Sequence, residues 1–130
     1  MENMFEATQH PIRPELVMSR LRGNGSGATV TFIGSLRGTS SDGSTVLHAN
    51  CDLDREAAER QLRDIGEAIR DRWGIEDVSI NHRLGRIEVG ETIAVVAVAA
   101  PHRQEAFEAC QYAIDRFKEF MPLQEVLEAK

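Results

Sequence analysis

Aromatic residues are scarce in this sequence. They make up 5% of the 130 residues, with one Trp (Trp73) and one Tyr (Tyr112), whereas apolar residues of all kinds make up 42%. A hydrophobic core must therefore consist mainly of Val, Ile, Leu and Ala side chains, and this content is enough for one ordinary core. Because two domains of usual size would need a longer chain, we expect residues 1–130 to form a single domain.

Cysteine is also rare, and the two cysteines, Cys51 and Cys110, lie far apart and outside any CxxC pattern. This argues against a disulfide framework and against a zinc knuckle, and two buried reduced thiols are the simplest interpretation. The histidines have no spacing that is typical of metal ligands. They are His10, His48, His82 and His102. We therefore expect no metal site and no cofactor.

Long apolar runs and an excess of positive charge are both absent. No apolar stretch approaches the ~20 residues that a bilayer-spanning helix needs, and residues 1–10 do not resemble a secretory signal. The 15 basic and 21 acidic residues give a formal net charge of −6. This charge argues against nonspecific binding to nucleic acid or to an anionic membrane. We expect a soluble cytoplasmic protein in which any anion-binding site is local.

The first third of the chain predicts one short helix and two strands. Pro14 opens an apolar pattern that favours a helix, and the glycine run at 23–27 ends it. The β-branched stretches 28–36 and 45–51 each predict a strand. Residues 38–44 are rich in Gly, Ser, Thr and Asp, so we expect the two strands to form a long hairpin with a mobile tip.

The most regular pattern follows, with apolar residues recurring at spacings of three and four as far as Trp73. It predicts a long helix that Asp52 or Asp54 caps and that Gly74 ends. Three strand patterns come next, and the third is apolar enough to be central in a sheet. They cover residues 78–82, 87–89 and 92–100.

A second long helix is predicted to begin near Pro101 or His102, with its apolar residues on one face. The order of elements predicts an α+β fold in which helices pack on a largely antiparallel sheet. Residues 121–130 carry too little pattern for a prediction and could form a flexible tail.

Basic side chains at the ends of these elements are candidates for an anion-binding site. His102 and Arg103 stand at a helix start, where free N–H groups and the helix dipole favour a phosphate or carboxylate. Arg37 follows a strand, and Lys118 lies a full helix length from His102, so one subunit alone need not bring all four together. Each has a plain alternative, because a surface arginine or a lysine near a helix C-terminus is favourable without any ligand.

His82 and Arg83 repeat the His-Arg pair of the second helix. His82 alternates with Val78 and Ile80, which places it on the apolar face of a strand. We therefore favour a hydrogen-bonded, partly buried histidine over a ligand-binding one.

Four ordered segments resemble one known family. Residues 27–37 (GATVTFIGSLR) are similar to its first strand, which ends in an arginine, and residues 82–91 (HRLGRIEVGE) to its HRxGxxxxGE stretch. Residues 99–107 (AAPHRQEAF) resemble its HRxxAF signature, and residues 114–118 (IDRFK) its helix-ending lysine, which Pro122 follows. The chain thereby resembles the large, catalytic subunits of molybdopterin synthase, the MoaE family, over residues 27–122.

The resemblance implies a MoaE-like α/β hammerhead fold and a sulfur-transfer activity. Members take sulfur from a small ubiquitin-like MoaD-type subunit whose C-terminal Gly-Gly ends as a thiocarboxylate. They use it to build molybdopterin, the precursor of the molybdenum cofactor, from cyclic pyranopterin monophosphate. The large subunit forms a homodimer, and each copy binds one small subunit, which gives a heterotetramer.

Site residues carry over position by position. The resemblance implies that Arg37, His102 and Arg103 bind the phosphate and pterin, together with Lys118. It makes Lys118 the catalytic residue, which could protonate a leaving oxygen or stabilise developing negative charge.

Some positions depart from the family. Glu125 stands where members have a second lysine, the chain stops at Lys130 where they continue, and residues 49–54 differ from the usual sequence. An alternative function is therefore a diverged, non-catalytic paralogue that binds a ubiquitin-like partner or a pterin. A third is a structural dimer whose basic residues only pair with surface carboxylates.

Overall fold

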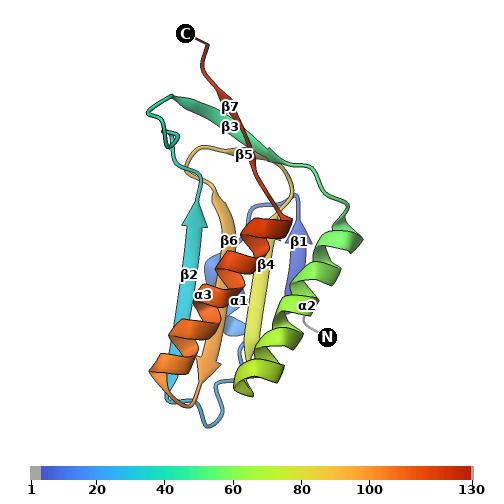
Figure 1. The fold of residues 1–130 in the computed structure, drawn as a ribbon, viewed down its shortest axis with the longest axis vertical. Helices are drawn as coiled ribbons and strands as arrows, with labels where there is room; N and C mark the ends of the chain where they lie inside the picture. Colours follow the sequence, from blue (N-terminus) through green and yellow to red (C-terminus); the bar gives the residue numbers. More distant parts are fainter. Residues whose placement is uncertain (1–3, 130) are drawn as a thin grey trace.

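The computed structural model describes residues 4–129, which form three helices and seven strands (Figure 1). In chain order they are β1 (Phe5–Thr8), α1 (Pro14–Ser19), β2 (Ala28–Ser35), β3 (Val46–Cys51), α2 (Arg55–Trp73), β4 (Val78–Arg83), β5 (Gly85–Glu88), β6 (Thr92–Ala100), α3 (Arg103–Phe120) and β7 (Gln124–Leu127). The predicted α+β class is confirmed. The strands β1 and β7, of four residues each, were not predicted from the sequence.

A four-stranded sheet with the order β1-β4-β6-β2 forms the main layer. The strand β6 is antiparallel to both of its neighbours, whereas β1 and β4 are parallel. The sheet is therefore largely antiparallel, and β6 occupies the central position that its apolar sequence predicted.

Different helices pack on the two faces of this sheet. On β6, Ala94, Val96 and Val98 belong to the main core, which lies under α2 and α3. The alternate residues Val95 and Ala97 pack on the opposite face against α1. Continuous apolar sequence is needed here because both faces of this strand are buried.

A second sheet with the order β5-β3-β7 lies across one end of the first (Figure 1). This arrangement shows that the predicted hairpin of 28–36 and 45–51 is wrong. The strand β2 pairs with β6 along its whole length, whereas β3 pairs with β5 and β7. Residues 38–44 make only a local turn, with a single bridge between Thr39 and Thr45, and carry the chain from one sheet to the other.

The ends of α2 follow the predicted capping. The carboxylate of Asp54 accepts a hydrogen bond from the backbone N–H of Ala57 at 3.0 Å. Gly74 ends the helix in the left-handed conformation, with φ at 71°, which a residue without Cβ adopts at little cost. Of the two acids that were candidates for the cap, Asp54 makes this bond.

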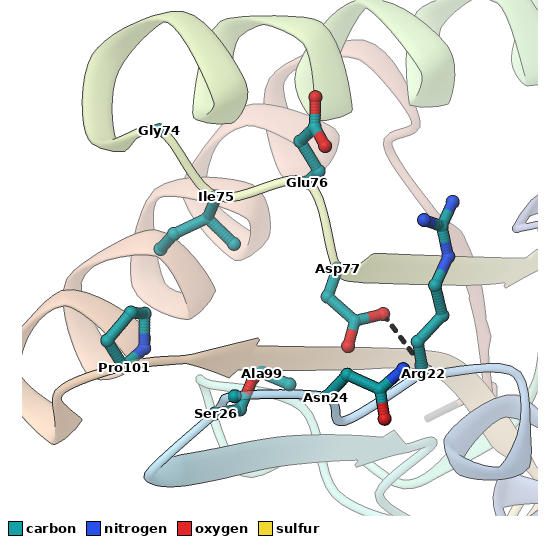
Figure 2. Close-up of a pocket in the computed structure, with 10 residues that line it drawn as sticks. Arg22, Asn24, Ser26, Gly74, Ile75, Glu76, Asp77, Ala99 and Pro101 are labelled. Atoms are coloured by element: carbon teal, nitrogen blue, oxygen red, sulfur yellow. Dashed lines mark hydrogen bonds between the residues drawn. The ribbon is translucent and has the colours of Figure 1, made fainter.

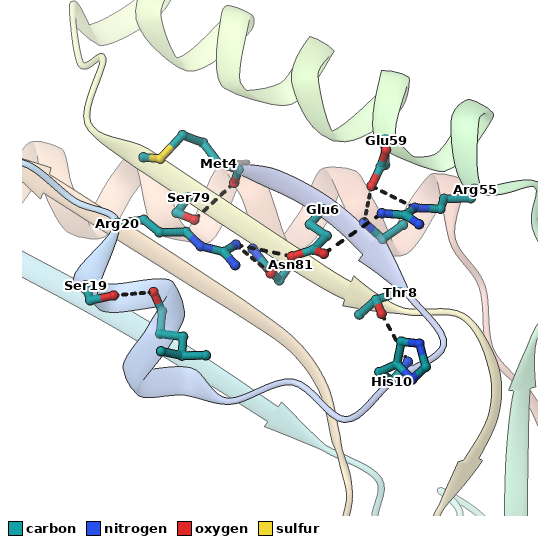
Figure 3. A network of polar contacts seen from close by, with 12 residues as sticks. Met4, Glu6, Thr8, His10, Ser19, Arg20, Arg55, Glu59, Ser79 and Asn81 are labelled. Carbon is teal, nitrogen blue, oxygen red and sulfur yellow. Dashed lines mark hydrogen bonds and ion pairs between the residues drawn. The ribbon is translucent and has the colours of Figure 1, made fainter. Parts of the chain in front are cut away.

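A polar network ties the edge strand β1 to its neighbours (Figure 3). Arg20 donates hydrogen bonds to Glu6 at 3.3 Å and to the side-chain oxygen of Asn81 at 3.1 Å. On the helix side, Glu59 accepts a hydrogen bond from the backbone N–H of Ala7 at 3.0 Å. The network stabilises the parallel pairing of β1 with β4. No helix in the described part of the chain is long and apolar enough to cross a membrane.

Candidate functional site

The candidate site residues lie at two opposite ends of the main sheet. The helix α3 begins at Arg103 beside the start of β2 and ends near the second sheet (Figure 1). Lys118 comes 15 residues after Arg103, which corresponds to about 22 Å along the helix axis. One chain therefore brings Arg37 and Lys118 to one end and leaves His102 and Arg103 at the other.

Lys118 borders a cavity of about 260 Å³ at the end of α3. Its walls come from β2, β4, β6, α3 and the segment that follows α3. The lining residues are Gly34, Ser35, His82, Ile93, Ala94, Phe117, Lys118, Met121, Pro122 and Leu123. Most of these are apolar or small, and His82 and Lys118 are the titratable ones.

Small residues in the sheet create the space for this cavity. His82 pairs with Ala94, and Ala94 pairs with Gly34, so these three positions form one row across β4, β6 and β2. Residues in one row project from the same face. Because Gly34 and Ala94 have little or no side chain, the row leaves room beside the His82 ring, below Phe117 and Lys118.

Lys118 is exposed at the border of the cavity and forms no ion pair within residues 4–129. It is also one of only two lysines in the sequence, the other being Lys130, among 15 basic residues. An arginine cannot deliver a proton near neutral pH, whereas a lysine can. The chemistry available at this position is therefore distinct from that of the arginine-rich remainder of the surface.

His82 is almost completely buried, with 1% of its surface exposed. Its Nδ1 lies 2.7 Å from the backbone oxygen of Arg83, and its ring meets Phe117 edge to face at 5.3 Å. Burial lowers the pKa of His82 from its usual 6.5, and this effect exceeds the opposing one of the hydrogen bond to the Arg83 carbonyl. The prediction of a hydrogen-bonded, partly buried histidine is confirmed for the hydrogen bond, and the burial is more complete than predicted. His82 also lines the cavity, which its spacing did not indicate.

Arg37 follows β2 at the same end of the sheet, two residues after Ser35 of the cavity wall, and its side chain is exposed. His102 and Arg103 are exposed at the other end, where His102 is the N-cap residue of α3. The carbonyl of His102 accepts a hydrogen bond from Ala106, and the first-turn N–H groups remain available to an anion.

A second hollow of about 290 Å³ lies at the His102 end, between the glycine run and the end of α2 (Figure 2). Asp77 accepts hydrogen bonds there from the backbone N–H groups of Arg22 and Gly23, at 2.9 and 2.8 Å. These donors are thus already bound to a carboxylate of the protein, so the glycine run is not a free cradle for phosphate.

The cysteines do not contribute a nucleophile to either end. Both Cys51 and Cys110 are free and buried, as the sequence suggested. Burial raises the pKa of Cys110 to about 11, which leaves the thiol protonated and unreactive near neutral pH. No group of three or more potential metal ligands occurs within residues 4–129.

Comparison with known proteins places these features in one family. The family described as MoaE protein matches residues 7–120. Molybdopterin synthase catalytic subunits from Bacillus subtilis and Halalkalibacterium halodurans are 34% and 36% identical to this chain over 119 residues. Each alignment covers 92% of this chain and 75% or 76% of the relative, respectively.

Solved structures agree with the sequence comparison. The crystal structure of molybdopterin synthase from Staphylococcus aureus has a TM-score of 0.89 and 30% identity, and covers 100% of this chain and 96% of that one. Molybdopterin cofactor biosynthesis protein E from Burkholderia multivorans has a TM-score of 0.81 at 25% identity, covering 98% and 92% of the two chains. The family match, the curated relatives and the shared fold together show that this chain belongs to the MoaE family.

Proposed function

We propose that this chain is the large, catalytic subunit of a molybdopterin synthase and acts as a sulfurtransferase in molybdenum cofactor biosynthesis. It takes sulfur from the C-terminal thiocarboxylate of a small ubiquitin-like MoaD-type subunit and transfers it to cyclic pyranopterin monophosphate. The observation that carries this proposal is Lys118, a lysine without an ion pair among residues 4–129, which lies beside an apolar cavity in a chain of this family. We expect the protein to act in the cytoplasm.

Lys118 is the proposed catalytic residue. Its ammonium group can donate a proton to a leaving oxygen or stabilise negative charge that develops as the thiocarboxylate attacks. The apolar walls beside it, including Phe117 and Leu123, exclude water and strengthen such an interaction.

The phosphate and pterin are proposed to bind Arg37, His102, Arg103 and Lys118. The helix N-terminus at His102 and Arg103 supplies backbone donors and positive charge for a phosphate. Since these two residues lie about 22 Å from Lys118 along α3, we propose that a second copy of the chain completes the site in a homodimer. Each copy then binds one small subunit.

The decisive experiment measures molybdopterin formation from a thiocarboxylated small subunit and cyclic pyranopterin monophosphate. We expect Lys118→Ala to lower the rate by about 10²-fold or more, as for loss of a general acid. The free energy of unfolding of this variant should be the same as that of the wild-type protein. Arg116→Ala is the matched control, because it removes a positive charge from the same helical turn, outside the cavity. Full activity in folded Lys118→Ala would refute the catalytic assignment.

A second candidate function is a non-catalytic MoaE-like protein that binds a ubiquitin-like partner or a pterin. It is favoured by Glu125, which lies exposed on β7 opposite Ala49 and would repel an anionic substrate nearby. Binding of the small subunit without product would support this alternative. Glu125→Lys would then be the variant to test for a gain of activity.

A further inference from the structure

His82 has one ring nitrogen that the fold does not use. Its Nδ1 faces the backbone oxygen of Arg83 at 2.7 Å, and a carbonyl oxygen can only accept, so Nδ1 must carry the proton. The neutral ring then has its lone pair on Nε2. No hydrogen bond within residues 4–129 involves this atom.

The free nitrogen is placed to face the cavity. Nδ1 is turned toward the strand's own backbone, so Nε2 lies at the far edge of the ring, where His82 lines the cavity beside Ala94 and Gly34. Nε2 has no hydrogen-bond partner in the described chain, yet it is not one of the fully buried polar atoms without a partner, so part of its surface is accessible. The fully buried atoms without a partner are Gln61 Oε1, Asn81 Nδ2 and Arg83 Nε.

We propose that Nε2 of His82 binds the C-terminal tail of the small subunit by accepting a hydrogen bond from the amide N–H of the tail's last glycine. This inference rests on the proposed function and adds a tail-binding residue to it. The tail lies in the cavity with its last amide at His82 and its anionic end toward Lys118.

The chemistry of the cavity favours this ligand over an anion alone. A lone pair accepts an N–H group and repels a carboxylate or phosphate oxygen, whereas the Lys118 ammonium attracts these anions. A ligand that satisfies both groups needs a donor N–H close to a negative charge. In a C-terminal glycine, a single carbon separates the amide nitrogen from the thiocarboxylate.

The shape of the cavity also favours a tail without side chains. The floor is made of Gly34 and Ala94, the wall includes Phe117 and Met121, and the volume is about 260 Å³. Two glycines in extended conformation fit between such walls without a Cβ to clash. The pterin also carries N–H donors, and the experiment distinguishes it from the tail.

The test combines a ring substitution with a tail modification. His82→Asn retains a donor for the Arg83 carbonyl and removes the acceptor at the Nε2 position, whereas His82→Gln retains an acceptor at that position. Tails ending in glycine or in N-methylglycine differ by the one N–H in question. Dissociation constants of the small subunit with each tail are measured for the wild-type chain and both variants.

We expect N-methylation to weaken binding to the wild-type chain about 3-fold to 10-fold, as for loss of one neutral hydrogen bond. The same modification should have little effect on His82→Asn, because the acceptor is already gone, and an intermediate effect on His82→Gln. An equal penalty in the wild-type chain and His82→Asn, or no penalty in the wild-type chain, would overturn the proposal.

Kinetic measurements show whether the N–H group that His82 binds belongs to the tail or to the pterin. If His82→Asn raises KM for the pterin substrate and leaves affinity for the tail unchanged, His82 binds the pterin and the tail assignment is wrong. Absence of product with the wild-type chain would refute the proposed function alone, because the tail-binding measurements need no turnover.

Discussion

His82 combines deep burial with a titratable ring. Its Nδ1–H is bound to the Arg83 carbonyl, and the ring edge packs on Phe117. The neutral ring can make both contacts. The hydrogen bond to the carbonyl would also favour a charged ring, but burial in this apolar surrounding disfavours the charge more strongly. The protonation state of this one side chain is thus linked to the stability of the fold.

The linkage predicts a loss of stability on mild acidification. In the unfolded chain His82 takes up a proton near its usual pKa of 6.5, whereas burial lowers the pKa in the folded chain. Between these values the unfolded state binds more protons, so the free energy of unfolding falls as the pH decreases below about 6.5. Urea unfolding at pH 7 and pH 5 should show this fall in the wild-type protein.

His82→Gln lacks the titrating ring and supplies the control. Other groups, such as Asp42 with its pKa lowered to about 2, titrate alike in both proteins, so only the difference between the proteins matters. The variant should lose less stability than the wild-type protein over this pH range. An identical loss in the two proteins would show that His82 does not titrate as described.

For single residues, the sequence predicted burial better than it predicted contacts. The alternation of His82 with Val78 and Ile80 correctly predicted a buried histidine. It did not indicate the cavity, because that depends on Gly34 and Ala94, which reach His82 only through strand pairing. The roles of Lys118 and Arg37 remain predictions.

Helix ends are the elements for which local sequence was most informative. Asp54 and Gly74 bound α2 as predicted, since capping needs only residues within one turn. The short α1 begins at Pro14, also as expected. These features could be predicted because each depends only on residues that are close together in the sequence.

The cap on α2 gives a stability prediction at this scale. Asp54→Ala removes the acceptor of the Ala57 N–H at 3.0 Å and should lower the free energy of unfolding by about 0.5–2 kcal/mol. Asp52→Ala, an exposed position before the cap, should change it by less than about 0.5 kcal/mol. Urea denaturation of the two variants makes the comparison, and equal effects would contradict the assignment of Asp54 as the cap.

Strand partners were harder to predict than the strands themselves. The segments 28–36 and 45–51 look like a hairpin because they are close in sequence and joined by turn-forming residues. In the structure β2 pairs with β6, from Ala28 opposite Ala100 to Ser35 opposite Thr92. The burial of the apolar face of β2 under α3 is a nonlocal property, so a local pattern could not indicate it.

At the scale of the whole molecule, the candidate residues at the two ends lead to a prediction about assembly. If each site combines Lys118 of one copy with Arg103 of another, Lys118→Ala and Arg103→Ala should each be inactive alone. A mixture of the two refolded together should regain about a quarter of wild-type molybdopterin formation, because half of the dimers are mixed and each has one intact site.

The matched control mixes Lys118→Ala with a double variant that carries Lys118→Ala and Arg103→Ala. No pairing of these chains restores an intact site, so no activity should return. Inactivity of the first mixture, with mixed dimers demonstrated by mass, would show that both residues act within one copy.

The overall class and the order of the long elements followed from the sequence. The arrangement into two sheets did not, because β2 and β3 follow each other in the chain but pair with different strands that come much later, β2 with β6 and β3 with β5. The family resemblance supplied the candidate residues. The sequence already placed Lys118 a full helix length from His102, and the fold confirms that α3 separates His102 and Arg103 from Lys118.

The strand order of the main sheet also has a consequence for synthesis of the protein. None of its neighbouring strands is consecutive in the chain, since β1 pairs with β4 and both β4 and β2 pair with β6. As the chain leaves the ribosome, β1 and β2 appear long before their partners, and the central strand arrives only at residues 92–100. The apolar face of β2 stays exposed until then, so folding is expected to be slow and this interval to be the stage most open to aggregation.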